Sequence, residues 1–300
     1  MTRQLSTSYV MSLAILVFGS GAYAQDGLAL MKVEPGARPS GMGSAFVSLT
    51  GDPNVSAYNP AGATGGSKFS AAFSHSTYWE NIRLENGFFT SPLKGRLFIH
   101  GGIRYATIDN LEMRQSPVDI PDALFEANDV SFKAGLAYRF SEKVSAGIGA
   151  GWFIEKIESW RGSAFNVDFG IQAVPRPDVR LGAAVTDLGS DFNLTKSGAV
   201  SSRDISLPTA YRFGGSYTYR KYLGAADIVV LDDKAHLHLG AESRLHELFQ
   251  LRAGFMSGYD SKNFTAGASF TRSSLRVDYA FVPYTHSLGT SHIFSFVFEI

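Results

Sequence analysis

The stretch Ser291-His-Ile-Phe-Ser-Phe-Val-Phe-Glu-Ile300 decides the fold. Read at every second residue, it has one aromatic face and one smaller, more polar face: Phe294, Phe296, Phe298 and Ile300 on the first, and Ser295, Val297 and Glu299 on the second. A half-buried strand of a soluble β-sandwich alternates in the same way. An aromatic strand at the end of the chain favours instead a transmembrane barrel, whose last strand pairs with its first and leaves no open edge.

The same period of two recurs about fourteen times between residues 67 and 300, for example in Val130–Phe140 and Phe165–Gln172. The expected connections alternate between tight turns, such as Ser141–Lys143, and roomier loops, chiefly Ala106–Asn128 and Asp187–Asp204. Short turns at one end and longer loops at the other are typical of outer-membrane barrels. The sequence therefore predicts an all-β, transmembrane antiparallel β-barrel of about 14 strands over residues 67–300, with Lys156–Ser163 as another of its roomier loops.

Composition narrows the function classes. The 300 residues hold 27 Lys+Arg and 27 Asp+Glu, so net charge gives no argument for a nucleic-acid partner. The 31 glycines, 13 tyrosines and 23 phenylalanines suit a barrel with aromatic girdles. There is no cysteine, which excludes disulfides, thiolate metal sites and a cysteine nucleophile.

Residues 1–24 have the pattern of a cleaved secretory signal peptide. Arg3 supplies the charged start, Val10–Phe18 the short apolar core, and Ala22-Tyr-Ala24 the cleavage site. The apolar run is shorter than the ~20 residues that a membrane-spanning helix needs. We expect export, and with it a location in the cell outer membrane.

Residues 25–66 are rich in glycine, proline and alanine and lack the strand pattern. Such a segment can press its backbone closely against other elements. In front of a barrel it predicts either an N-terminal plug that lines the lumen or a loop on the periplasmic rim.

Charged residues fall on the more polar faces of the predicted strands, where we expect them to face the lumen because charge is costly against lipid. They could be paired structurally or could line a selective pore. These expected lumen charges are Lys133, Arg139, Asp168, Arg180, Arg212, Glu242, Arg252, Arg276 and Asp278.

No catalytic constellation is evident. The seven histidines are scattered, and neither a Gly-x-Ser-x-Gly nor a His-Glu-x-x-His motif occurs. His236 and His238 share one strand face but lack a second pair of ligands, and Asp232-Asp233 reads as a solvated turn. We therefore expect no enzyme activity, no cofactor and no metal.

Two runs carry a family resemblance: Gly36-Ala-Arg-Pro-Ser-Gly-Met-Gly-Ser-Ala-Phe46, and Asp52-Pro-Asn-Val-Ser-Ala-Tyr-Asn-Pro-Ala-Gly62. With Leu207–Phe213 and Asp278–Phe281 in the same order, they resemble the PorV/PorQ family, within the superfamily of the long-chain fatty-acid transporter FadL. The resemblance implies a fourteen-stranded outer-membrane barrel with a small N-terminal segment in its lumen. It also implies a component of type IX secretion that engages secretion-machinery proteins and the C-terminal domains of cargo.

Three functions therefore stand side by side, and each assumes outer-membrane lipid around the barrel. The first is the type IX secretion role, exercised through the extracellular loops. The second is a FadL-like channel for fatty acids or other hydrophobic ligands, with an apolar pocket beneath the plug near Met42, Phe46 and Tyr58. The third is a structural barrel with a closed lumen. In all three, the expected plug signature is Gly41, Gly43, Asn59 and Pro60.

Overall fold

The computed structural model describes residues 32–78, 82–116, 119–201 and 204–300. The expected signal peptide, residues 1–24, and the first part of the expected plug lie outside the described residues. Within the described part of the chain, no helix is long and apolar enough to cross a membrane.

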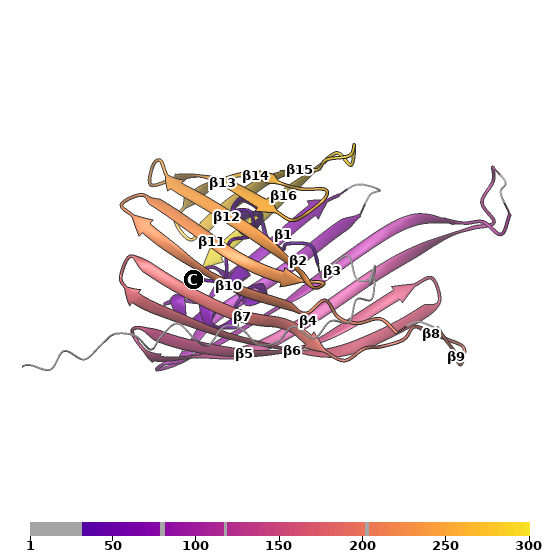
Figure 1. Ribbon diagram of the computed structural model, residues 1–300, viewed down its shortest axis with the longest axis horizontal. Coiled ribbons are helices and arrows are strands. Elements are labelled where there is room, and N and C mark those ends of the chain that lie inside the picture. Colours follow the sequence, from indigo (N-terminus) through magenta and orange to yellow (C-terminus); the bar gives the residue numbers. More distant parts are fainter. Residues whose placement is uncertain (1–31, 79–81, 117–118, 202–203) are drawn as a thin grey trace, which may run out of the picture.

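Fourteen long strands, all paired antiparallel, close into a barrel within this part of the chain (Figure 1), which confirms the predicted fold class. Closure is complete because β1 pairs with β16 and β5 pairs with β6. The strands are β1 (Ser70–Thr77), β2 (Arg83–Lys94), β3 (Leu97–Met113), β4 (Ala123–Ser141), β5 (Val144–Ile157), β6 (Trp160–Arg176), β7 (Val179–Gly189), β10 (Ala210–Tyr219), β11 (Tyr222–Leu231), β12 (Lys234–Arg244), β13 (Phe249–Ser257), β14 (Phe264–Arg272), β15 (Leu275–Pro283) and β16 (Thr290–Glu299).

The aromatic face of β16 points outward and its other face points into the barrel. Phe294, Phe296 and Phe298 are 40–48% exposed, whereas Ser295 and Val297 are buried. Phenylalanine, leucine and isoleucine occupy equivalent outward positions all round the barrel. Such an apolar belt is costly in water and matches the hydrocarbon of a bilayer.

The two ends of the barrel differ, as Figure 1 shows. We call the end with β2–β3, β4–β5 and β6–β7 connections the turn end, because these connections are short. The opposite, loop end carries the segment between β7 and β10, with the short strands β8 (Thr195–Lys196) and β9 (Ala199–Val200). There the β3–β4 hairpin projects well beyond the other strands.

Two predicted loops are largely strand. Most of Ala106–Asn128 belongs to the β3–β4 hairpin. Within Lys156–Ser163, only Glu158 and Ser159 lie outside β5 and β6, as a two-residue turn. Cross-strand pairing continues past the barrel rim in both places, and the turn residue Glu158 adopts φ of 55°. Neither feature shows in the alternation of the sequence.

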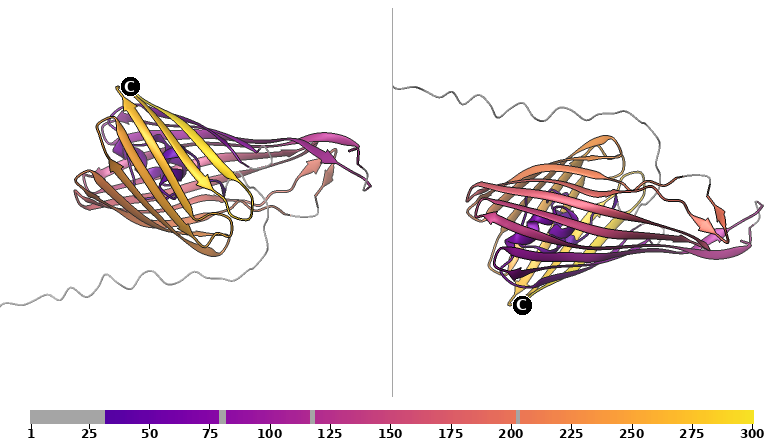
Figure 2. Two further views of the ribbon diagram at one scale, coloured as in Figure 1. Left: turned by 90° about the horizontal axis from the view of Figure 1, so that it is seen from above. Right: turned by 90° about the horizontal axis from the view of Figure 1, so that it is seen from below.

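Residues 32–66, which we call the inner segment, lie inside the barrel (Figure 2). They form the short helix α2 (Ala37–Gly41) and the 3-10 helices η1 (Pro53–Ala57) and η2 (Pro60–Gly65). The side chains of Asp52 and Asn59 cap η1 and η2, each accepting a hydrogen bond from a backbone N–H two residues later. Proline at the first position of each helix fits the local backbone.

Glycines in the strands allow the backbone of the inner segment to touch the barrel wall. A Cβ added at Gly254 would lie 2.0 Å from the Gly43 nitrogen, and one at Gly182 would lie 2.3 Å from the Val47 oxygen. Such distances exclude any larger residue unless the backbone moves. The same holds where Gly147 and Gly240 meet the backbone of the inner segment, and Gly170 makes room for the Asn59 side chain.

Candidate functional site

A network of six charged side chains joins the inner segment to β12, β13 and β15. Arg38 pairs with Asp52 at 3.2 Å and with Glu242 at 3.0 Å, and Arg276 also pairs with Asp52. The wall side of the network is completed by the ion pairs Arg252–Glu242, Arg252–Asp278 and Arg276–Asp278, at 2.6, 3.3 and 2.9 Å. Each charge is therefore shared between two partners, which offsets the cost of burying it.

Burial alone would raise the pKa of the Asp52 carboxyl. The guanidiniums of Arg276 and Arg38, together with the hydrogen bond from the Asn54 N–H, outweigh burial and hold that pKa well below its usual value. Asp52 is therefore ionised at neutral pH and binds both arginines.

Three polar side chains hold the backbone of the inner segment. Asp227 of β11 accepts hydrogen bonds from the N–H groups of Phe46 and Val47, at 2.6 and 2.9 Å. Asn59 donates to the carbonyl of Val47 at 2.8 Å, and Gln172 of β6 donates to that of Leu49 at 2.9 Å. The sequence analysis did not predict that Asp227 and Gln172 contact the inner segment, although both occupy the inward positions of alternating strands.

The four residues of the expected plug signature all lie against the wall. Gly41 and Gly43 approach the backbones of β14 and of β12 and β13. Asn59 also donates to the Ile171 carbonyl of β6 at 3.1 Å, and Pro60 lies against Gly147 of β5.

The nine expected lumen charges occupy the inward face of their strands. Lys133 pairs with Asp168 and with Asp187, each at 2.8 Å, so Asp187 is a partner that the sequence reading missed. Arg139 donates to the Thr64 carbonyl, and the Arg212 guanidinium lies 5.3 Å from the centre of the Tyr58 ring. Four others belong to the six-residue network: Glu242, Arg252, Arg276 and Asp278.

Met42, Phe46 and Tyr58 form the packed core of the inner segment. All three are at most 1% exposed and cluster with Leu49 and Val55. The Phe46 and Tyr58 rings have centres 5.3 Å apart. Of the three, Tyr58 lines a narrow cleft of about 20 Å³. This cleft is too small for a hydrophobic ligand.

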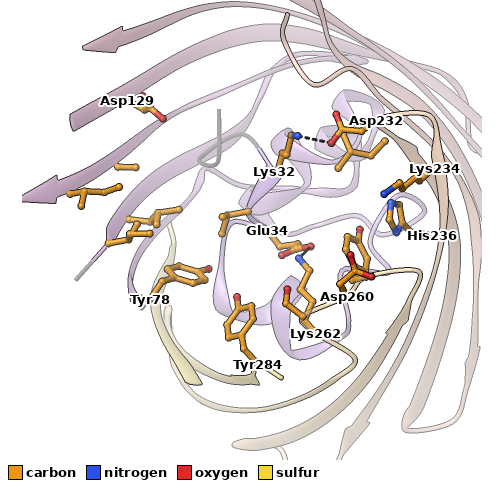
Figure 3. A pocket seen from close by; sticks show the side chains of 18 of the residues that line it. Lys32, Glu34, Tyr78, Asp129, Asp232, Lys234, His236, Asp260, Lys262 and Tyr284 are labelled. Atoms are coloured by element: carbon orange, nitrogen blue, oxygen red, sulfur yellow. Dashed lines mark hydrogen bonds and ion pairs between the residues drawn. The ribbon is translucent and has the colours of Figure 1, made fainter. Parts of the chain in front are cut away.

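A cavity of about 400 Å³ lies at the loop end, above the inner segment (Figure 3). One wall is apolar and aromatic and the other carries most of the charges. The apolar wall includes Val33, Tyr78, Ile82, Leu84, Ala106, Ile108 and Tyr284, and the polar wall includes Lys32, Glu34, Asp232, Lys234, His236, Tyr259 and Lys262. Its residues come from the start of the inner segment and from strands and loops far apart in the sequence.

Ion pairs tie the polar wall together. Lys32 lies 2.5 Å from Asp232, and Lys262 lies 2.5 Å from Glu34 and 4.5 Å from the centre of the Tyr259 ring. Burial alone would raise the pKa of Glu34, but the Lys262 ammonium outweighs burial and lowers it below the usual value. Both lysines are thus engaged with carboxylates.

The two histidines of β12 both contact Tyr259. The His236 ring stacks on the Tyr259 ring at 4.0 Å, and His238 Nε2 lies 2.9 Å from the tyrosine oxygen. Among the described residues, no group of three His, Cys, Asp or Glu side chains could hold a metal ion.

The apolar wall continues into the loop between β7 and β10. Tyr78 and Leu84 belong to a buried cluster that also contains Phe153 of β5 and Phe192 and Leu207 of the loop. A bridge between Phe192 and Ile205 draws the two arms of the loop together. The loop is thereby anchored beside the cavity.

Comparison with known proteins identifies the fold. No family model matches the chain, and no curated protein matches it. The Pseudomonas putida toluene transporter TodX is similar in structure, with 12% sequence identity, a TM-score of 0.66 and coverage of 89% of this chain and 98% of that one. The CymD monoaromatic hydrocarbon channel has 12% identity, a TM-score of 0.64 and coverage of 91% and 99%. This chain shares their fold.

A Pseudomonas aeruginosa FadL homologue is similar as well, with 12% identity, a TM-score of 0.57 and coverage of 87% of this chain and 97% of that one. The fold expected from the FadL superfamily is thus confirmed. None of these three structures is named as a PorV/PorQ protein, so that finer resemblance stays an expectation.

Proposed function

We propose that the protein is an outer-membrane channel that takes up a small hydrophobic solute through the cavity at its loop end. The observation that carries this proposal is the aromatic and apolar wall of that 400 Å³ cavity, inside a closed barrel with an apolar outer belt. An apolar cavity of about 150 Å³ is large enough for benzene. The toluene transporter and the monoaromatic hydrocarbon channel named above have the same fold.

The charges of the cavity favour an uncharged solute. Of its three lysines, Lys32 and Lys262 already hold carboxylates at 2.5 Å. A fatty-acid carboxylate that bound either of these two lysines would have to break its pair, and Lys234, the third lysine, is exposed to water, where an ion pair contributes little. A neutral aromatic or aliphatic molecule needs no such exchange.

Toluene binding to the purified barrel in detergent tests this proposal, with octanoate as the charged comparison. Ala106→Phe places a ring in the cavity and should weaken toluene binding by about tenfold or more, equal to ~1.4 kcal/mol. Ala241→Phe, on the outward face of β12, is the matched control and should bind as the wild type does. Equal binding by the Ala106 variant, or octanoate binding tighter than toluene, would overturn the proposal.

The type IX secretion role expected from the resemblance has no support among these structural neighbours, whose names describe solute channels. The closed-lumen alternative predicts that neither toluene nor octanoate binds the wild-type barrel. The binding experiment therefore separates it from the channel.

A further inference from the structure

A second cavity, of about 190 Å³, lies at the turn end between the inner segment and strands β4–β7. Thr50 and Thr64 of the inner segment form one side of it. Arg139, Lys143 and Arg180 contribute three cations to the other side, against the single carboxylate of Glu142. The lining therefore has two positive charges in excess.

This excess differs from the other lumen clusters that contain several charges. There the cations hold carboxylates at 2.5–3.3 Å, as in Lys133–Asp168, Arg252–Glu242 and Lys262–Glu34. Within the described parts of the chain, neither Arg139 nor Arg180 forms an ion pair with a carboxylate. Two guanidiniums that share a small cavity repel each other unless an anion lies between them.

The cavity is also held in shape before any ligand arrives. Arg139 donates to the Thr64 carbonyl and its guanidinium lies 5.0 Å from the centre of the Phe98 ring, so its direction is fixed. Gln172 is fixed by its bonds to the Val47 and Leu49 carbonyls, at 3.2 and 2.9 Å. A site with fixed donors loses little side-chain freedom on binding.

We propose that this turn-end cavity binds a small oxyanion of the phosphate type, and that the bound anion bridges the inner segment to β4 and β7. Arginine forks match the oxygen geometry of phosphate, and the hydroxyls of Thr50 and Ser145 offer further donors. The cavity lies beside the β4–β5 turn, which supplies Glu142 and Lys143, so the anion enters as a free solute from the side of the short turns. The proposal is independent of the hydrophobic cavity at the loop end.

Calorimetric titration of the full-length barrel with inorganic phosphate, in lipid-free detergent, tests this site. We expect the wild type to bind phosphate and Arg180→Gln to bind it about tenfold more weakly or worse, because a charge-assisted pair is lost. Arg220→Gln is the matched control, since Arg220 lies in the β10–β11 turn at the same end but outside the cavity. Arg139→Lys keeps the charge but loses the fork, and should be intermediate.

A second readout covers variants that fold poorly. Phosphate should raise the unfolding temperature of the wild type and of the Arg220 variant, because a ligand stabilises the state that binds it, and should leave that of Arg180→Gln unchanged. The proposal fails if the wild type shows neither heat nor a shift. It also fails if Arg180→Gln matches the wild type, or if only vesicles of anionic phospholipid, and not free phosphate, give the effect.

Discussion

At the scale of single residues, Asp227 shows how one carboxylate positions the inner segment. It is 1% exposed and accepts two backbone N–H groups through a single oxygen. Asp227→Ala would leave the N–H groups of Phe46 and Val47 without a partner, at a cost of about 1–3 kcal/mol for each buried group. We expect faster hydrogen exchange at these two amides, measured by mass spectrometry.

Asp227→Asn retains one acceptor oxygen and should exchange at an intermediate rate. Asp178→Ala removes an exposed carboxylate of the turn end and should leave the two amides protected. Equal protection in all three variants would mean that Asp227 does not hold the segment.

Asp52 makes the docking of the inner segment in the barrel depend on pH. Its pKa is lower when docked than in the unfolded chain, where an aspartate has a pKa of about 3.9. The stabilisation is therefore complete above this unfolded value and is lost as the pH falls through the lower, docked pKa. We expect the segment to resist pepsin near pH 4 and to become cleavable in stronger acid.

Asp52→Asn is the control for that experiment. It cannot ionise, so its docking should be weaker at neutral pH and should change less between pH 4 and stronger acid. A cleavage profile identical to that of the wild type would show that other groups set the acid response.

At the scale of elements, the contact between β13 and the residues directly after α2 depends on the absence of a side chain. Gly254→Val would push against the Gly43 nitrogen and the Met42 backbone, and overpacking of this kind costs about 1–3 kcal/mol. We expect a lower unfolding temperature on heat-modifiability gels. Gly224→Val is the matched control, because a Cβ at Gly224 meets nothing within 4 Å.

The strands also show which features of the fold can be predicted from the sequence. Alternation predicts the strands and their inward faces, because side chains of a strand alternate strictly. It does not predict where pairing stops, so the sequence predicts loops at Ala106–Asn128, the outer part of the β3–β4 hairpin, and at Lys156–Ser163. The charges could be placed on the lumen side, but their partners, such as Asp187 for Lys133, depend on the register and on a bulge between β6 and β7.

The loop-end cavity could not be predicted from the sequence for a related reason. Its walls combine Lys32, Tyr78, Ala106, Lys262 and Tyr284, which lie up to 252 positions apart and meet only after the barrel closes. The FadL-like channel hypothesis predicts an apolar pocket beneath the plug, near Met42, Phe46 and Tyr58. The structure has a packed core there instead, because these side chains face each other within the inner segment.

At the scale of the whole molecule, the apolar outer belt makes the stability of the fold depend on a surrounding lipid bilayer. Phe296→Arg would put a charge on the lipid face, which costs about 2–4 kcal/mol near the middle of the bilayer. Phe296→Leu keeps the face apolar and serves as the control. We expect the arginine variant to fold into vesicles with a lower urea midpoint, and an unchanged midpoint would show that this face does not meet hydrocarbon.

The long β3–β4 hairpin sets how far the molecule extends beyond the apolar belt at its loop end. β4 has 19 residues, about 60 Å at the rise of an extended strand. Tilted as barrel strands are, it still spans about 45 Å along the membrane normal, well beyond an apolar belt of ~25 Å. In the outer-membrane channel proposed above, a peptide epitope inserted after Gln115 would therefore stand clear of the lipid headgroups, and we expect antibodies or bacteriophages to reach it on living cells.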